Sequence, residues 1–376
     1  MIMQLAALRP IYQAQGPVAT VYLQSQTAGA NAEQQVRLRW DALRTQLTDA
    51  GADEQTVSAL DDAVLGAENV GTIRTEGRVL VAGPSGLLLE EDFDATGAGG
   101  DRAVLGETAQ LGDYLRQRLR SVRALVALVD QERAALRRLV LSSQEVPSTG
   151  PESSVEGSAV ESVHKPRGGA LKHRKIQGTA DEAAKQNIRD VVEHIRRADA
   201  RWNPDVLVIA GEVQGRSLLY EQLPSDLQQI AHQVEAGGGI AGDSADEGAE
   251  ESLAEELSGL VRQLTVDRVA ELTEQFGDAR GNGLALEGAE NVRRALQLGA
   301  VDTLLLRYGQ SAEDDSRSGG DPDDPQDPAH HVVEDQLLRD AAEVDASVAL
   351  VGAAVKENVA ALLRYDAPVD QMDSAP

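Results

Sequence analysis

A short run of concentrated positive charge carries the clearest chemistry in this sequence. Residues 164–175 read HKPRGGALKHRK, and no acidic residue occurs between Ser162 and Ala180. The formal net charge of the chain is -27, so these cations oppose the field of the whole protein. Gly168 and Gly169 permit a close approach of the backbone to a ligand. The run predicts electrostatic binding of phosphate groups, which needs no contact with bases, although a solvated surface loop has the same composition.

A second pattern with possible phosphate chemistry is AGEVQGRS at residues 210–217. It follows an expected strand and opens an expected helix, which is the usual place of a phosphate-binding loop. Its glycine spacing fits neither the phosphate-loop nor the dinucleotide pattern, and Arg216 stands where a phosphate loop needs lysine. We therefore interpret it as a plain turn between a strand and a helix.

Metal and nucleophile chemistry have little support. The segment HHVVE places His330 and Glu334 four residues apart, a spacing that lets two side chains share a metal, but no third ligand is evident. There is no GxSxG motif and no Ser/His/Asp grouping, and the absence of cysteine excludes a thiol nucleophile. The sequence predicts no metal, no cofactor and no catalytic residue.

The composition bounds the class of protein. Hydrophobic residues make up 41% of the 376 residues and aromatic residues only 3%, so the cores must be built of Leu, Val, Ile and Ala. The first residues lack the pattern of a signal peptide, and no apolar run is long enough to span a bilayer. We expect a soluble, cytoplasmic protein with no membrane partner. Acidic segments at 242–256 and 312–328 predict solvated linkers and loops, and the net charge argues against DNA.

The spacing of apolar residues predicts the helices and strands that position the basic run. We expect them to form three domains. Residues 1–118 form an α+β domain, 119–241 an α/β domain that contains the basic run, and 253–376 a further α/β domain, where 291–308 and 347–365 each couple a helix with a strand. In the middle domain a hairpin at 123–141 precedes the run and a strand at 205–212 follows. Thr179 is the expected cap of the intervening helix. Its expected buried stripe consists of Ala184, Ile188, Val191, Val192 and Ile195.

The segment PRGGALKHRKIQ, before a long helix in the middle one of three α/β units, resembles the class I release factor and Pelota superfamily of archaea and eukaryotes. More narrowly it resembles the bacterial archaeo-eukaryotic release factors, including the Balon-type ribosome hibernation factors of actinobacteria. ENVRRALQLGAVDTLLL, GPVATVYL, HKP and AALLRY add to the resemblance. It implies a three-domain release-factor and Pelota-like architecture with layered α/β middle and C-terminal domains.

In release factors the two glycines of this loop are followed by a glutamine that helps to place water on the peptidyl-tRNA ester. Here Ala170 stands in that position, so we expect little or no ester hydrolysis. The stop-codon motifs of eukaryotic factors are absent. The resemblance implies that the loop binds RNA. The candidate RNA-binding residues are His164, Lys165, Arg167, Gly168, Gly169, Ala170, Lys172, His173, Arg174 and Lys175.

Three hypotheses remain open. The first is a non-catalytic factor that occupies the A site of the 70S ribosome and directs the loop to the peptidyl-transferase centre, near ribosomal RNA and tRNA. Such a factor would block translation in dormancy or stress. Its partner would be elongation factor Tu or another translational GTPase. Arginines in 116–123 and at 137–138 would add RNA contacts or be strand-edge charges. The second is a release or rescue factor that hydrolyses peptidyl-tRNA. The third is a scaffold whose acidic loops bind basic proteins.

Overall fold

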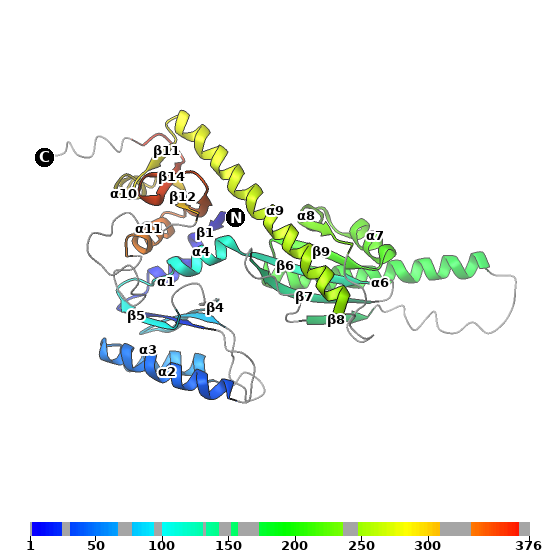
Figure 1. Ribbon diagram of the computed structural model, residues 1–376, viewed down its shortest axis with the longest axis horizontal. Helices are drawn as coiled ribbons and strands as arrows, with labels where there is room; N and C mark the ends of the chain where they lie inside the picture. Colours follow the sequence, from blue (N-terminus) through cyan, green and yellow to red (C-terminus); the bar gives the residue numbers. More distant parts are fainter. Residues whose placement is uncertain are drawn as a thin grey trace. The chain divides into compact units, whose positions relative to one another are not determined.

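The computed structural model describes residues 2–24, 31–66, 77–93, 100–130, 133–142, 152–156, 173–235, 247–308 and 332–367. The chain divides into two compact units. We call residues 120–266 the middle unit, and residues 1–119 together with 267–376 the split unit. Most elements of both are labelled in Figure 1.

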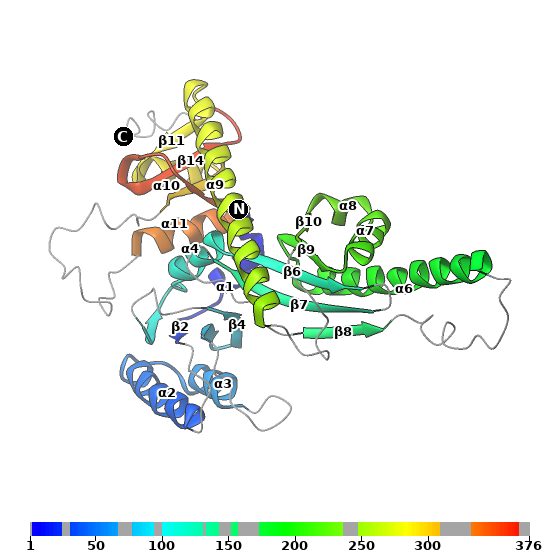
Figure 2. The ribbon, with the colours of Figure 1, turned by 45° about the vertical axis from the view of Figure 1, so that its right-hand side comes forward.

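The first half of the split unit is a four-stranded antiparallel sheet with the strand order β4-β3-β2-β5. One face is covered by α2 and α3, as Figure 2 shows. Val36, Trp40, Leu43 and Leu47 recur at helical spacing along α2 and are all buried on this face. The elements are β2 (Val18–Leu23), α2 (Ala32–Asp49), α3 (Glu54–Leu65), β3 (Arg78–Gly83), β4 (Gly86–Asp92), β5 (Arg102–Gly106) and α4 (Gly112–Arg120).

The second half of the split unit is a five-stranded mixed sheet with the order β1-β13-β12-β14-β11. Its edge strand β1 comes from the start of the chain and pairs antiparallel with β13. The helices α10 and α11 share a core with one face of this sheet, and that core also includes residues of η1, α1 and α4. The elements are β1 (Ile2–Gln4), η1 (Leu5–Leu8), α1 (Arg9–Tyr12), β11 (Ala285–Glu287), α10 (Ala289–Gln297), β12 (Val301–Arg307), α11 (Val332–Glu343), β13 (Ser347–Val351), η4 (Lys356–Asn358) and β14 (Val359–Leu363).

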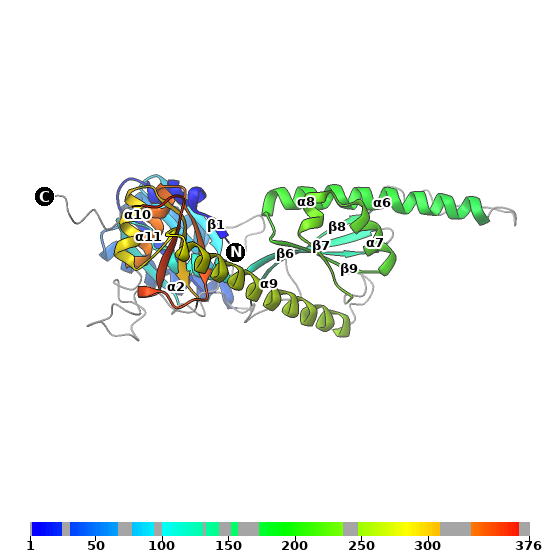
Figure 3. The ribbon, with the colours of Figure 1, turned by 90° about the horizontal axis from the view of Figure 1, so that it is seen from above.

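The middle unit is a five-stranded sheet with the order β10-β9-β6-β7-β8, in which β6, β9 and β10 run parallel. α6, α7 and α8 cover one face and the start of α9 covers the other (Figure 3). Because both faces are covered, β6 and β9 are continuous apolar runs. The elements are β6 (Val122–Val129), β7 (Arg133–Leu141), β8 (Glu152–Glu156), α6 (His173–Trp202), β9 (Val206–Gly211), α7 (Val213–Gln222), α8 (Ser225–Gln229), β10 (Ala231–Gln233) and α9 (Glu247–Gly281).

The predicted mixed α/β and α+β fold class is confirmed. The boundary between the units falls inside α9, at residues 266 and 267. Leu253, Leu257 and Val261 of α9 are buried in the core of the middle unit, whereas Leu272 and Phe276 belong to the core of the split unit. The division into three domains stays a prediction. Among the described helices, none is both long and apolar enough to cross a membrane.

Three local expectations were wrong. The helix expected from Thr179 begins at His173, so Thr179 lies inside it. Residues 347–365 hold two strands and a short 3-10 helix in place of a helix and a strand. The acidic segment 242–256 is not all linker, because residues from Glu247 onward form the first turns of α9.

Candidate functional site

The basic run lies mainly outside the described residues. This holds for His164, Lys165, Arg167, Gly168, Gly169, Ala170 and Lys172. The backbone of the last three candidates, His173, Arg174 and Lys175, forms the first turn of α6. Their assignment as RNA-binding residues stays a prediction.

The helix that follows the basic run is firmly held on the sheet. α6 contains 30 residues, which corresponds to a length of roughly 45 Å. Ala184, Ile188, Val191, Val192 and Ile195 are all buried, as the periodicity predicted. They pack in the core formed with β6, β7 and β9. The basic run, whose last three residues begin α6, is therefore attached to an element that is held on the sheet of the middle unit.

The turn between β9 and α7 is used for close packing. Gly211 has a φ of 102°, and a Cβ placed there would lie 2.4 Å from the carbonyl oxygen of Val129. A Cβ at Gly215 would lie 2.8 Å from the carbonyl oxygen of Asp130. The guanidinium of Arg216 donates a hydrogen bond to the carbonyl of Val234. Each of these residues therefore has a packing role, which supports the interpretation as a plain turn.

Glu334, considered above as a metal ligand with His330, forms an ion pair. Its carboxylate is fully buried and accepts hydrogen bonds from Nε and Nη2 of Arg116 at 2.6 and 2.7 Å. His330 lies outside the described residues. In the described part of the chain, no group of three or more His, Asp or Glu side chains is placed to hold a metal ion. Glu334 thus has a structural partner in Arg116.

Arginines proposed as additional RNA contacts differ in burial, and Arg118, Arg120 and Arg123 are half-buried. Arg116 is buried against Glu334, and Arg137 is buried with its Nη1 2.8 Å from a carboxylate oxygen of Glu250 in α9. Neither side chain is accessible to a nucleic acid, so these two expectations were wrong. Arg138, the next residue on β7, is exposed. It remains a candidate contact.

A serine and a histidine meet where the edge strand β8 passes α6. Ser153 Oγ lies 3.1 Å from Nε2 of His194. Burial lowers the pKa of His194, and the positive charge of Arg197 lowers it further. The imidazole is therefore held in its neutral form near pH 7. Local spacing in the sequence does not reveal this pair, because its members are 41 residues apart and lie on different elements.

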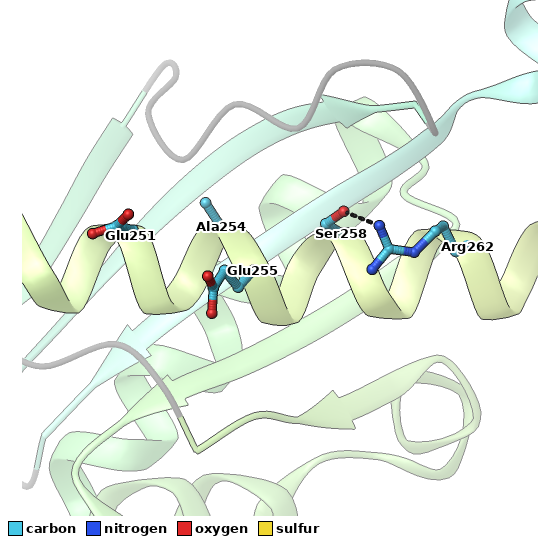
Figure 4. A pocket seen from close by; sticks show the side chains of 5 residues that line it. All are labelled: Glu251, Ala254, Glu255, Ser258 and Arg262. Atoms are coloured by element: carbon cyan, nitrogen blue, oxygen red, sulfur yellow. Dashed lines mark hydrogen bonds between the residues drawn. The ribbon is translucent and has the colours of Figure 1, made fainter.

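An open hollow of about 610 Å³ lies along one face of α9. Figure 4 shows the five side chains that line it, and Ser258 Oγ accepts a hydrogen bond from Arg262 Nη1 at 3.0 Å. The lining residues are Glu251, Ala254, Glu255, Ser258 and Arg262. They all come from a single helix and mix both signs of charge, so the hollow has none of the convergent polar groups of a ligand site.

Comparison with known proteins relates these features to a family. Residues 123–282 match the model of bacterial archaeo-eukaryotic release factor family 2. A relative in Mycobacterium tuberculosis (strain CDC 1551 / Oshkosh), "Uncharacterized protein MT2704", is 28% identical over 316 residues, which cover 80% of this chain and 77% of the relative. The matched range includes the basic run, α6 and the sheet of the middle unit.

Solved structures of translation factors show a distant likeness. One is that of S. cerevisiae Dom34, "a translation termination-like factor involved in RNA quality control pathways and interacting with Hbs1", with 13% identity, a TM-score of 0.39, and coverage of 81% of this chain and 78% of Dom34. Another is a model of ribosome-bound archaeal Pelota and ABCE1, with 16% identity, a TM-score of 0.39, and coverage of 96% and 93%. These TM-scores are too low to support an argument about function.

The family match falls on the part of the chain that contains the basic run and nearly all of the middle unit. The family model covers the hairpin of β6 and β7, the basic run, α6 and the whole of α9. The narrower relationship to Balon-type factors stays a prediction. Residues 123–282 of this chain are thus similar to bacterial archaeo-eukaryotic release factor family 2.

Proposed function

We propose that this protein binds the bacterial 70S ribosome at the A site and directs its basic run, residues 164–175, to the peptidyl-transferase centre. There the run contacts phosphates of ribosomal RNA and of tRNA. The protein acts in the cytoplasm as a hibernation factor that blocks translation in dormancy or stress. Elongation factor Tu or another translational GTPase accompanies it.

The observation that carries the proposal is the position of the basic run within the family match. The matched residues 123–282 contain the run and all of α6. Lys172, Arg174 and Lys175 place positive charge next to a rigid helix in a chain with 62 acidic and 35 basic residues. Local cations in an acidic protein favour a phosphate-rich partner reached through this surface.

Ala170 supports a non-hydrolytic role. It follows Gly168 and Gly169, in the position of the glutamine of release factors. An alanine supplies a backbone N–H but no side-chain amide to orient an attacking water molecule. Since positioning and polar stabilisation are what such a site contributes, the proposed role is occupation of the centre without cleavage of the peptidyl-tRNA ester.

Co-sedimentation with 70S ribosomes over a series of salt concentrations tests the proposal. The test variant carries Lys172→Glu, Arg174→Glu and Lys175→Glu, and the matched control carries Arg37→Glu, Arg262→Glu and Lys356→Glu at exposed positions. We expect wild-type binding to weaken with salt and the loop variant to bind at least about ten-fold more weakly than the control.

Equal binding of the loop variant and the control would show that the run is not the anchor. A wild-type protein that does not pellet with ribosomes at low salt would refute the proposed function. Binding to basic proteins in place of ribosomes would favour the scaffold hypothesis.

A further inference from the structure

One face of the middle sheet exposes an arginine next to α6. Side chains alternate along β7, so Arg138 leaves the sheet on the same face as Ala134 and Leu136. Those two residues are buried in the core formed with α6, whereas Arg138 is exposed. Arg138 therefore lies on the face of the sheet that α6 covers, just beyond the residues that α6 buries.

The side of α6 that faces β8 carries two more polar side chains, His194 and Arg197. His194 and Arg197 are three residues apart and share one side of the helix. The contact between Ser153 and His194 fixes that side toward β8. Ser153 pairs in register with Leu136, so His194 lies at the level of Leu136 and Arg138 lies two residues farther along β7.

Arg138 and Arg197 lie toward the same end of the sheet. β7 ends where Leu141 pairs with Val122, the first residue of β6. α6 ends at Trp202, and the N–H of Asp205 then donates to the carbonyl of Arg123 near the start of β6. From the level of His194, β7 and α6 thus both continue toward the start of β6, and this places Arg138 and Arg197 toward the same end of the sheet.

Arg138 and Arg197 differ from the nearby arginines of β7 in their ion pairs. Arg133 pairs with Asp130, and Arg137 pairs with Glu250. Within the described residues, no carboxylate lies within ion-pair distance of Arg138 or Arg197, and Arg197 Nε donates to the carbonyl of Glu193 in its own helix. The chain has 62 acidic residues for 35 basic ones, so two exposed arginines toward the same end of one sheet are a local exception to its negative charge.

We propose that Ser153, His194, Arg197 and Arg138, here called the His194 patch, form a second surface that binds the phosphate backbone of RNA. Guanidinium groups match phosphate oxygens in two-point hydrogen bonds, and the serine hydroxyl and the imidazole are further polar partners. The inference rests on the proposed function and extends it from the basic run to the far end of α6.

The length of α6 places the second surface far from the basic run. About 36 Å of helix separate the first turn at His173 from Arg197. The continuous helix sets the spacing between its two ends, and the buried stripe at residues 184–195 holds it on the sheet. Two fixed contact points bind one RNA surface more tightly than either alone and also define the orientation of the middle unit on it.

The experiment is ribosome co-sedimentation of the full-length chain over a salt series with a double variant, Arg138→Glu and Arg197→Glu. The matched control is Arg37→Glu and Arg262→Glu, which changes the net charge equally at exposed positions on other elements. Thermal unfolding monitored by circular dichroism verifies that both variants fold. A third variant, Arg138→Lys and Arg197→Lys, keeps the charge and removes the two-point geometry.

We expect the charge-reversed patch to bind about ten-fold more weakly than the control. Its log affinity should also depend less steeply on log salt, with a slope smaller by about one for each RNA phosphate that the patch no longer neutralises. The lysine variant should lie between wild type and the reversed patch. If the reversed patch and the control bind equally while the loop variant is weakened, the His194 patch is refuted and the proposed function stands. If wild type does not bind ribosomes, both fail.

Discussion

Arg116 in α4 and Glu334 in α11 form a bidentate ion pair across 218 residues of sequence. Arg116 Nη1 also donates to the carbonyl of Arg307 at 3.0 Å. The next acidic residue, Asp335, accepts a hydrogen bond from the N–H of Gly112 at the start of α4. Two consecutive carboxylates of α11 therefore hold α4. Glu334 binds the side chain of Arg116, and Asp335 binds the backbone N–H at the positive, N-terminal end of the helix.

Replacement of Arg116 by Ala should destabilise the split unit by about 3–5 kcal/mol, because it leaves the carboxylate of Glu334 buried without its cation. Urea unfolding monitored by circular dichroism measures this loss. The control is Arg293→Ala, which removes an ion pair with Glu290 whose two side chains are 31% and 59% exposed and should cost less than about 1 kcal/mol. Equal losses in the two variants would contradict a structural role of the buried pair.

Gly211→Ala should destabilise the middle unit by about 2 kcal/mol or more. The new Cβ would clash with the carbonyl of Val129, and the φ of 102° is strained for alanine. The matched control is Gly259→Ala inside α9, where nothing lies within 4 Å of the new Cβ. That change should stabilise the helix by about 1 kcal/mol. Chemical denaturation of both variants measures their free energies of unfolding. A Gly211→Ala variant as stable as wild type would refute the packing role of the turn.

The stability of the middle unit should depend on the protonation of His194. Its pKa in the folded protein is lowered from 6.5, so the unfolded chain binds more protons below that pH and stability falls as the pH is lowered through this range. Replacement with Gln removes this contribution. The melting temperature of His194→Gln should therefore fall less than that of wild type between a pH of about 7.5 and about 5.5. An equal fall in both proteins would refute the assignment.

The wild-type protein should not release peptide from peptidyl-tRNA on ribosomes above the background rate, because Ala170 offers no side-chain amide to position water. A release assay with labelled peptidyl-tRNA measures this directly. The comparison variant, Ala170→Gln, restores the amide and should release more peptide than wild type. Robust release by wild type that survives changes at 168–170 would favour a rescue factor that works by another route.

The sequence predicted those elements whose burial follows a local period. The stripe of Val36, Trp40, Leu43 and Leu47 shows in the spacing alone, and so does the apolar run of β9. By contrast, residues 359–363 read VAALL, which suits a helix or a strand equally. They form the strand β14 because they pair on one side with β12 and on the other with β11.

Charged residues were harder to predict than apolar ones, since their roles depend on distant partners. Glu334 lies four residues from His330, a spacing that two ligands of a metal can have, whereas its actual partner is Arg116, 218 residues away. Arg137 and Arg138 are adjacent and chemically identical, yet one is buried against Glu250 and the other is exposed. Only the register of β7 and the position of α9 distinguish them.

The division into units also determines the order in which parts of the chain become available during synthesis. The middle unit is one continuous stretch, 120–266, whereas the split unit needs segments from both sides of it. β1 cannot pair until β13 has been made, which takes on the order of ten seconds after the middle unit is finished at ordinary elongation rates. The segment with the basic run therefore belongs to the unit that can fold first on the ribosome, while the N-terminal strand still waits for its partner.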